Sequence, residues 1–324
     1  MDSISLIKSP ISAELEDFKK HFDTCLSSSN LLLNSVIAHI RQKNGKMMRP
    51  ILVLLAAKLY NEVRPATLHA AVALELLHTA SLVHDDVVDE STERRGQLSV
   101  NAIFNNKVAV LTGDYLLATA LVEVGMTRNY AIIDLVSNLG QDLAEGELLQ
   151  LSNVSNPEYS EEVYFDVIRK KTAALFTASA ESGALSAGAS EEEVSRAADF
   201  GEMIGIAFQI KDDIFDYYES PELGKPTGND MLEGKLTLPA LYVINKLNDE
   251  SVRELALRIR ALKASKEEIA SFVELVKREG GIAHAEQVMY EYRNRALQLL
   301  PASADEALRL SLTAYIDYVI ERKK

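Results

Sequence analysis

Cysteine and proline are scarce in this sequence. Cys25 is the only cysteine among 324 residues, so an internal disulfide is excluded, and no spaced set of Cys and His accompanies it as in a zinc site. Cys25 is therefore predicted to be a small apolar core residue in a protein of a reducing compartment. With 8 prolines and 47% hydrophobic residues, the composition is that of a globular protein rather than a disordered or fibrous one.

Long hydrophobic runs and an excess of positive charge are also missing. The most apolar run, residues 51–57, is far shorter than the ~20 residues that span a bilayer, and residues 1–18 lack the features of a secretory signal. The net charge is -14 and lysine and arginine are dispersed, which argues against a nucleic-acid surface. We expect a cytoplasmic protein with no transmembrane segment and no nucleic-acid partner.

Apolar residues recur at helical spacing along almost the whole chain, as in Leu52, Leu55 and Leu59, while strand-like alternation is absent. This predicts an all-α fold. We expect one domain over residues 1–324, a multi-helix bundle, because no gap between helices resembles a flexible interdomain linker. The longest irregular segment, residues 220–234, is the expected mobile lid. The helical pattern is broken at Pro10, Asn44-Gly45, Arg64-Pro65, Gly96, 153–157, 220–228 and Gly280-Gly281.

Two clusters of three aspartates have identical spacing, with the first and last aspartate of each four residues apart on one helix face. They are Asp85, Asp86 and Asp89, and Asp212, Asp213 and Asp216. Such a cluster is locally unfavourable, because aspartate is a poor helix former, like charges repel, and acids near a helix C-terminus oppose the helix dipole. A bound divalent cation would offset this cost.

Oxygen-only ligands favour a hard cation, and Mg²⁺ characteristically binds one or two carboxylates together with waters and substrate phosphates. Carboxylates on two facing helices plus Mg²⁺ therefore suggest a diphosphate held between them. A single cluster is equally well explained as a solvated surface or a helix cap. Two clusters of the same spacing, both in apolar helices, favour the metal.

Two rival sites fail on the residues themselves. Glu75 and His78 match the Glu-x-x-His element of helical di-iron proteins, but such a site needs two elements, and no other histidine has a glutamate three residues earlier. Residues 228–235 resemble a P-loop, but they have one residue too many between the glycines, and Leu236 replaces the required Ser or Thr.

A diphosphate site also needs cationic side chains near the carboxylates. The sequence offers Lys46, Arg49, Arg94, Arg95, Lys171, Lys225 and Lys235. Each of these alone is as well explained by an exposed surface charge. His78 could likewise be a core histidine, and Thr172 and Gln209 could be ordinary helical polar residues.

Several segments together have a more specific meaning: residues 45–50, 76–90, 94–96, 113–116, 145–150, 171–173, 208–216 and 224–239. Through them, nearly the whole chain resembles the trans-isoprenyl diphosphate synthases, known as the polyprenyl synthetase family. The resemblance implies the isoprenoid synthase fold, an all-helical bundle around a central cavity, and a homodimer that uses isopentenyl diphosphate and an allylic diphosphate.

The resemblance also implies roles for the candidate residues. Three Mg²⁺ ions on the allylic diphosphate would be bound by Asp85, Asp89 and Asp212, with supporting roles for Asp86, Asp213 and Asp216. The same diphosphate would be held by Arg94, Lys171, Lys225 and Lys235. Isopentenyl diphosphate would be bound by Lys46, Arg49, His78 and Arg95. The developing allylic cation would be lined by Thr172 and Gln209.

The product length is predicted from helix geometry. The tail must run from Asp85 toward the N-terminus of the same helix, and each turn climbs about 5.4 Å, close to one isoprene unit. One turn before the cluster stand Ala80 and Ser81, both small, where short-chain members of the family carry an aromatic residue. Leu77 and Leu74 lie further along. We expect a long-chain, all-trans, octaprenyl-like product made from a farnesyl primer.

Three alternatives stay open. One is a short-chain farnesyl or geranylgeranyl diphosphate synthase. Another is a terpene cyclase or head-to-head synthase, which would have no use for the isopentenyl-binding residues. The third is a non-catalytic subunit of a hetero-oligomeric synthase, in which degraded aspartate motifs would be expected. Transient membrane contact during product release is a further expectation.

Overall fold

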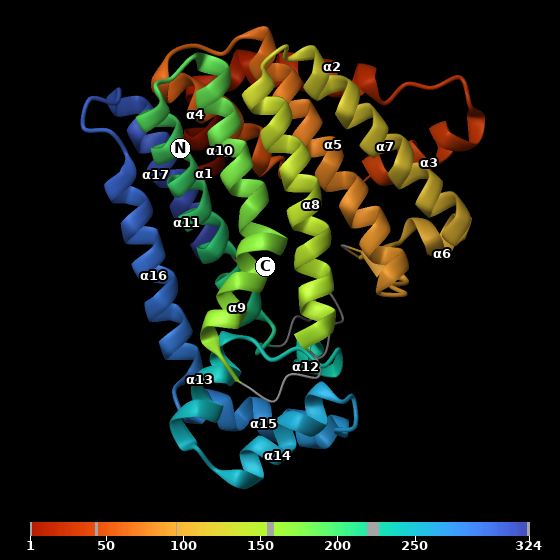
Figure 1. The fold of residues 1–324 in the computed structure, drawn as a ribbon, viewed down its shortest axis with the longest axis vertical. Helices are drawn as coiled ribbons and strands as arrows, with labels where there is room; N and C mark the ends of the chain where they lie inside the picture. Colours follow the sequence, from red (N-terminus) through yellow and green to blue (C-terminus); the bar gives the residue numbers. More distant parts are fainter. Residues whose placement is uncertain (1, 43–44, 95, 154–158, 219–226, 323–324) are drawn as a thin grey trace. The chain divides into compact units, whose positions relative to one another are not determined.

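Helices make up most of the structure, a computed structural model that describes residues 2–42, 45–94, 96–153, 159–218 and 227–322 (Figure 1). Strands in these residues are limited to β1 (Glu93–Arg94) and β2 (Gln97–Leu98), which pair antiparallel. The all-α prediction is confirmed. The chain divides into two compact units, and the prediction of a single domain over residues 1–324 stays a prediction.

The first unit comprises residues 1–140, 175–201 and 300–315. Its helices are α1 (Ser3–Lys8), η1 (Ser9–Ile11), α2 (Ser12–Cys25), α3 (Leu31–Arg41), α4 (Met48–Tyr60), α5 (Pro65–Val88), α6 (Val100–Phe104), α7 (Asn106–Met126), and most of α10 (Ala174–Ala187) and α17 (Glu306–Glu321). Two further helices, α8 (Tyr130–Asn153) and α11 (Glu191–Phe215), contribute residues to both units.

The 24-residue helix α5 carries the first aspartate cluster. Pro65 stands in its first turn, where a missing N–H costs no helical hydrogen bond. Its apolar residues are buried, with Leu74 fully inaccessible, and the helix lies alongside α4 and α7 (Figure 1). Gly113 on α7 allows this close approach, because an added Cβ would overlap the ring of His84. Most of α5 is buried, whereas Asp85 and Asp89 near its C-terminal end are accessible to solvent.

The second unit comprises residues 141–174, 202–299 and 316–324. Its own helices are α9 (Glu161–Ile168), η2 (Arg169–Ala173), α12 (Asn229–Leu232), α13 (Leu238–Leu247), α14 (Glu250–Arg260), α15 (Lys266–Arg278) and α16 (Gly281–Leu299). The predicted break at Gly280-Gly281 falls at the start of α16, where Gly280 has a positive φ of 87°. The short element η2 is a π-helical turn, a geometry often found at functional sites.

Two expectations from the sequence change. Of the predicted lid, residues 220–226 lie outside the described residues. Residues 227–234 contain the short helix α12. Cys25 is only partly buried rather than a core residue, and its thiol donates to the Glu123 carboxylate at 3.1 Å. A cysteine judged isolated along the sequence therefore has polar neighbours in space.

By length and composition alone, α5 and α7 could each cross a membrane. In α5, 61% of the apolar window is buried inside the protein, as expected of a core helix. In α7 only 39% of the window is buried. The expectation that no segment could span a bilayer rested on the shortness of uninterrupted apolar runs. By length and composition, α7 does not meet that expectation.

Candidate active site

The first aspartate cluster ends α5, as the sequence predicts. Asp85 is partly exposed, Asp89 is exposed, and Asp86 is buried with 3% of its surface accessible. The backbone N–H of Asp89 donates to the carbonyl of Asp85 at 2.8 Å, which closes the helix. Asp85 and Asp89 thus offer accessible carboxylates one turn apart.

Asp86 has a different role from its neighbours. Its Oδ1 accepts a hydrogen bond from Nε of Arg94 at 2.7 Å, so the β1 strand is tied to the end of α5. Burial raises the pKa of the Asp86 carboxyl, and the adjacent Arg94 guanidinium works in the opposite direction. Asn101 on α6 also donates to the backbone carbonyl of Asp86. The geometry makes Asp86 and Arg94 a supporting pair for the cluster.

A cavity of about 110 Å³ opens beside this pair in the first unit. Its lining includes Met47, His78, Asp86 and Arg94, so residues that the sequence assigns to the two substrates meet in one place. His78 is 9% exposed. The cavity therefore joins the end of α5 to the segment that precedes α4.

The isopentenyl candidates Lys46 and Arg49 flank the start of α4. Lys46 is exposed, and Arg49 lies in the first turn of the helix, where backbone N–H groups favour anions. The Arg49 guanidinium stacks on the ring of Phe176 at 5.1 Å. The first residue of α4 is held further by the Tyr315 hydroxyl, which donates to the carbonyl of Met48 at 2.9 Å.

The second aspartate cluster closes α11 in the second unit, and its buried member is Asp213, with 2% of its surface accessible. Asp213 accepts hydrogen bonds from the Tyr164 hydroxyl at 2.6 Å and from Nε2 of Gln209 at 2.8 Å. Burial, together with the nearby charge of Asp230, raises the pKa of Asp213 well above its usual range. Its carboxylate is held in place rather than offered to solvent.

The other two members of this cluster have other partners. Asp212 forms an ion pair with Arg322, whose guanidinium also lies over the Phe208 ring at 3.9 Å. Asp216 accepts the backbone N–H groups of Asn229 at 3.0 Å and Asp230 at 3.1 Å, and so caps the start of α12. The three aspartates of the second cluster therefore lie in three different environments.

A chain of hydrogen bonds connects two further predicted residues to this cluster. The Thr172 hydroxyl donates to Oε1 of Gln209 at 2.7 Å, and the Gln209 amide continues to Asp213. Thr172 lies in the π-helical turn η2, which also contains Lys171. Thr172 and Gln209, the two residues expected to line the allylic cation, are therefore in direct contact, and that role stays a prediction.

The basic candidates of the second unit are also held by neighbours. Lys171 forms an ion pair with Glu147 and donates to Oε1 of Gln150 at 3.3 Å. Nζ of Lys235 lies 2.6 Å from Oε2 of Glu233, so these two side chains form an ion pair. The α8 side chains Glu147 and Gln150 therefore orient Lys171.

Two predicted site residues, Arg95 and Lys225, lie outside the described residues. The two aspartate clusters belong to different units, so their expected pairing across one substrate stays a prediction. The same holds for the assignment of individual residues to the two diphosphates.

The four predicted chain-length residues all lie on α5. Ala80, Leu77 and Leu74 are buried, and Ser81 is partly buried. None of them is among the residues that line the cavity beside Asp86. They occupy a different face of α5, and the Ser81 hydroxyl turns back to the carbonyl of His78 at 2.9 Å.

Sequence reasoning missed Tyr164, Asp230 and Arg322. Arg322 follows the last helix and Tyr164 lies within α9, and neither stands in a motif with the aspartates. Asp230 belongs to the matched segment 224–239, so that segment could have drawn attention to it. The contacts that reveal these three residues exist only in the folded chain.

The donor set suits Mg²⁺. Asp85 and Asp89 supply accessible carboxylate oxygens with no nitrogen or sulfur donor in either cluster, and such oxygens favour a hard cation. Asp212 supplies a third partly exposed carboxylate, which is paired with Arg322 in this structure. The three aspartates predicted as metal ligands are therefore chemically fit to bind a divalent cation.

A known protein family matches most of this chain. Residues 30–276 match the family model described as Polyprenyl synthetase. This chain belongs to the polyprenyl synthetase family. It is a prenyltransferase enzyme, as the resemblance in the sequence predicted.

Relatives of named activity match almost the full chain. Heptaprenyl diphosphate synthase component 2 of Geobacillus stearothermophilus is 36% identical over 310 residues, which cover 94% of this chain and 96% of that protein. Octaprenyl diphosphate synthase of Escherichia coli strain K12 is 33% identical over 300 residues, 92% and 93% of the two chains. A crystal structure of geranylgeranyl pyrophosphate synthase from Bacteroides thetaiotaomicron is 60% identical, with a TM-score of 0.88 and coverage of 99% and 100%.

Proposed function

We propose that this polyprenyl synthetase condenses isopentenyl diphosphate with farnesyl diphosphate as the allylic primer, and that its product is a long-chain, all-trans polyprenyl diphosphate of octaprenyl-like length. We also propose that it works as a homodimer in the cytoplasm. The relatives named as heptaprenyl and octaprenyl synthases support a long product.

The observation that carries this proposal is the small size of Ala80 and Ser81 on α5. They stand about one turn before Asp85, on the path that a tail anchored at the cluster would follow toward the helix N-terminus. Neither position carries an aromatic ring of its own. Counted at about 5.4 Å per turn, the helix from Leu68 to Asp89 has the length of about six isoprene units.

Catalysis in this proposal rests on charge. Asp85, Asp89 and Asp212 would hold Mg²⁺, which supplies electrostatic stabilisation to the diphosphate as it leaves the allylic carbon. Lys171 and Lys235 bind and orient that diphosphate. The isopentenyl double bond then attacks the allylic carbon, and the departed diphosphate accepts the proton that the condensed product loses.

The chain's own polar network positions these groups. Glu147 and Gln150 orient Lys171 from α8, and Tyr164 and Gln209 fix the buried Asp213. The Thr172 hydroxyl and the Gln209 amide present oxygen dipoles that can stabilise a developing cation. These residues need only hold their positions, because none of them has to transfer a proton.

A second candidate is a geranylgeranyl diphosphate synthase. The observation that favours it is the 60% identity to a solved structure that bears this name. The two candidates share one reaction and differ only in where elongation stops. A third, a subunit that is inactive alone, draws on the relative named as a component of a heptaprenyl synthase, although both aspartate motifs are complete in this chain.

One experiment separates the three. The purified protein alone is incubated with isopentenyl diphosphate, farnesyl diphosphate and Mg²⁺, and the products are sized by mass spectrometry. An octaprenyl-like product supports the proposal. A product that stops at the geranylgeranyl length supports the second candidate, and no turnover without an added partner supports the third.

A further inference from the structure

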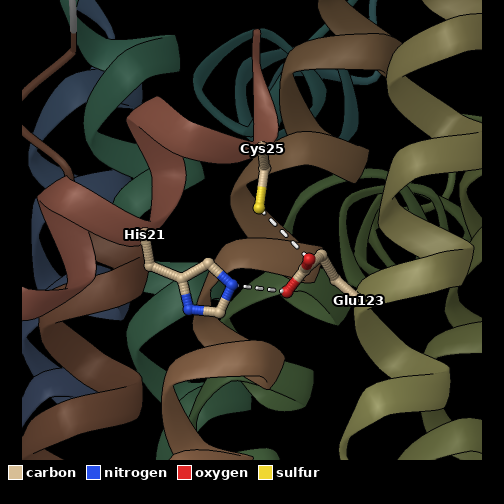
Figure 2. A group of neighbouring side chains, drawn as sticks. All are labelled: His21, Cys25 and Glu123. Atoms are coloured by element: carbon tan, nitrogen blue, oxygen red, sulfur yellow. Dashed lines mark hydrogen bonds and ion pairs between the residues drawn. The ribbon is translucent and has the colours of Figure 1, made fainter.

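Four side chains from three helices of the first unit converge, and none of them belongs to an aspartate cluster. His21 and Cys25 come from α2, His69 from α5 and Glu123 from α7. Figure 2 shows His21 and Cys25 both directed at the Glu123 carboxylate. The proposed prenyl transfer uses none of these residues.

The contacts around Glu123 are short. Nε2 of His21 lies 3.0 Å from Oε2 of Glu123, and Nδ1 of His69 lies 2.7 Å from the same oxygen. The Cys25 thiol donates to Oε1 at 3.1 Å. One carboxylate therefore gathers two imidazoles and a thiol, and the two imidazole rings meet edge to face at 4.6 Å.

Glu123 is a buried acid, with 7% of its surface accessible. Within the part of the chain that the structure describes, its ion-pair partners are histidines, and no lysine or arginine pairs with it. A buried carboxylate requires compensation by hydrogen bonds or positive charge. Burial and the neighbouring Glu123 carboxylate raise the pKa of the Cys25 thiol to about 12, so the free protein carries a thiol rather than a thiolate here.

We propose that His21, Cys25 and Glu123 form a binding site for a zinc ion, with His69 as the residue that positions Glu123. One ligand atom from each of the three lies within 4.8 Å of the other two. Nitrogen, sulfur and carboxylate oxygen are the donors that zinc takes, and three protein ligands plus a water form a common coordination set. On binding, the thiol proton of Cys25 passes to solvent and the sulfur coordinates as thiolate.

This site differs chemically from the aspartate clusters. Mg²⁺ prefers oxygen ligands alone, whereas a thiolate and an imidazole select zinc or a similar transition metal. His69 holds the carboxylate from α5, as outer hydrogen-bond partners of metal ligands generally do. A bound ion would therefore join α2 to α7 and give the buried Glu123 a permanent positive partner.

The test uses the full chain without a histidine tag. After saturation with zinc and dialysis, we expect about one zinc per chain by elemental analysis. Cobalt should replace it and give a thiolate-to-cobalt charge-transfer band, which only Cys25 can produce because the chain has no other cysteine. This band separates the site from any metal held by the aspartates.

Three variants and one control make the test specific. Cys25→Ser and His21→Gln should each weaken zinc binding more than about 100-fold, while His69→Gln should weaken it about 10–100-fold as expected of a positioning residue. His284→Gln on α16 is the matched control and should bind as the wild type does. Zinc should raise the Tm of the wild type by several degrees and leave that of Cys25→Ser unchanged.

Circular dichroism shows whether each variant is folded, and the cobalt spectrum of the wild type needs no variant at all. The proposal is overturned if the wild type gives no charge-transfer band with cobalt, or if Cys25→Ser retains as much zinc as the wild type. Either result would make the cluster a metal-free hydrogen-bond network. Neither depends on the length of the prenyl product.

Discussion

Asp85 on α5 and Asp212 on α11 are the carboxylates whose removal should cost the most activity. Asp85→Ala and Asp212→Ala should each lower turnover about 100-fold or more, because a metal at these carboxylates contributes several kcal/mol of charge stabilisation. Both side chains are partly exposed, so the helical circular dichroism should stay unchanged. The measurement is initial-rate kinetics at saturating Mg²⁺.

Asp199 gives a matched control for these variants. It is an exposed aspartate on the same helix as Asp212, but it stands outside the cluster. Asp199→Ala should keep the wild-type rate. Near-normal turnover in Asp85→Ala or Asp212→Ala would contradict the proposed mechanism.

Arg322 pairs with Asp212, and it should compete with the metal for that carboxylate. Arg322→Ala should lower the Mg²⁺ concentration for half-maximal activity about 2- to 5-fold, because a partly exposed ion pair of this kind contributes about 0.2–1 kcal/mol. The measurement is a Mg²⁺ titration of the initial rate. An exposed arginine of the same unit, Arg295, serves as the control. A higher Mg²⁺ requirement in Arg322→Ala would show that Arg322 assists the site instead.

The spacing of the six aspartates can be predicted from sequence, but their partners cannot. Tyr164 is 49 residues from Asp213, and Arg322 is 110 residues from Asp212. Contacts between such distant residues leave no local pattern. For the same reason Cys25 was predicted to be apolar, although His21 stands four residues before it on one helix face and could have signalled a polar pair.

At the scale of the elements, α5 is where product length should be set. Ala80→Phe should place a ring one turn below the cluster and shorten the products to about three or four isoprene units, while the first condensation continues. Products are sized by mass spectrometry after incubation with isopentenyl and farnesyl diphosphates.

Ala80→Ser is the matched control, since serine is nearly as small as alanine and should leave the long product unchanged. Ala80 is 2% exposed, so circular dichroism of the Phe variant must show an intact helix signal. An unchanged product distribution in a folded Ala80→Phe protein would mean that a residue elsewhere limits the tail.

Helices were predictable as a class because apolar residues follow the helical period and because Pro65 and Gly280-Gly281 mark real boundaries. Two irregular elements were not. The π-helical turn η2 has no periodic signature, and the four-residue helix α12 depends on its cap, Asp216, which lies 13 residues away. Both elements adjoin predicted site residues.

At the scale of the whole molecule, α7 presents an apolar surface that the sequence alone did not reveal. Leu111 is 67% exposed, Leu121 54%, Val122 64% and Met126 52%. Apolar residues occur on every face of α7, so the sequence does not show which face is buried. Only the fold distinguishes the buried face from the exposed one. A row of exposed apolar residues on one helix is typical of a surface that another chain covers.

The proposed homodimer should therefore use α7. The wild-type protein should sediment at twice the 35.8 kDa chain mass. Leu121→Arg should raise the dimer dissociation constant at least ~30-fold, because a charge replaces an apolar contact in the centre of the covered face. Leu257→Arg on α14 is the matched control, since this leucine is 48% exposed, and it should leave the dimer intact. A monomeric wild type, or a Leu121→Arg protein that dimerises as tightly as the wild type, would rule out α7 as the dimer interface. Liposome flotation would then test whether the exposed apolar face of α7 contacts membranes during product release.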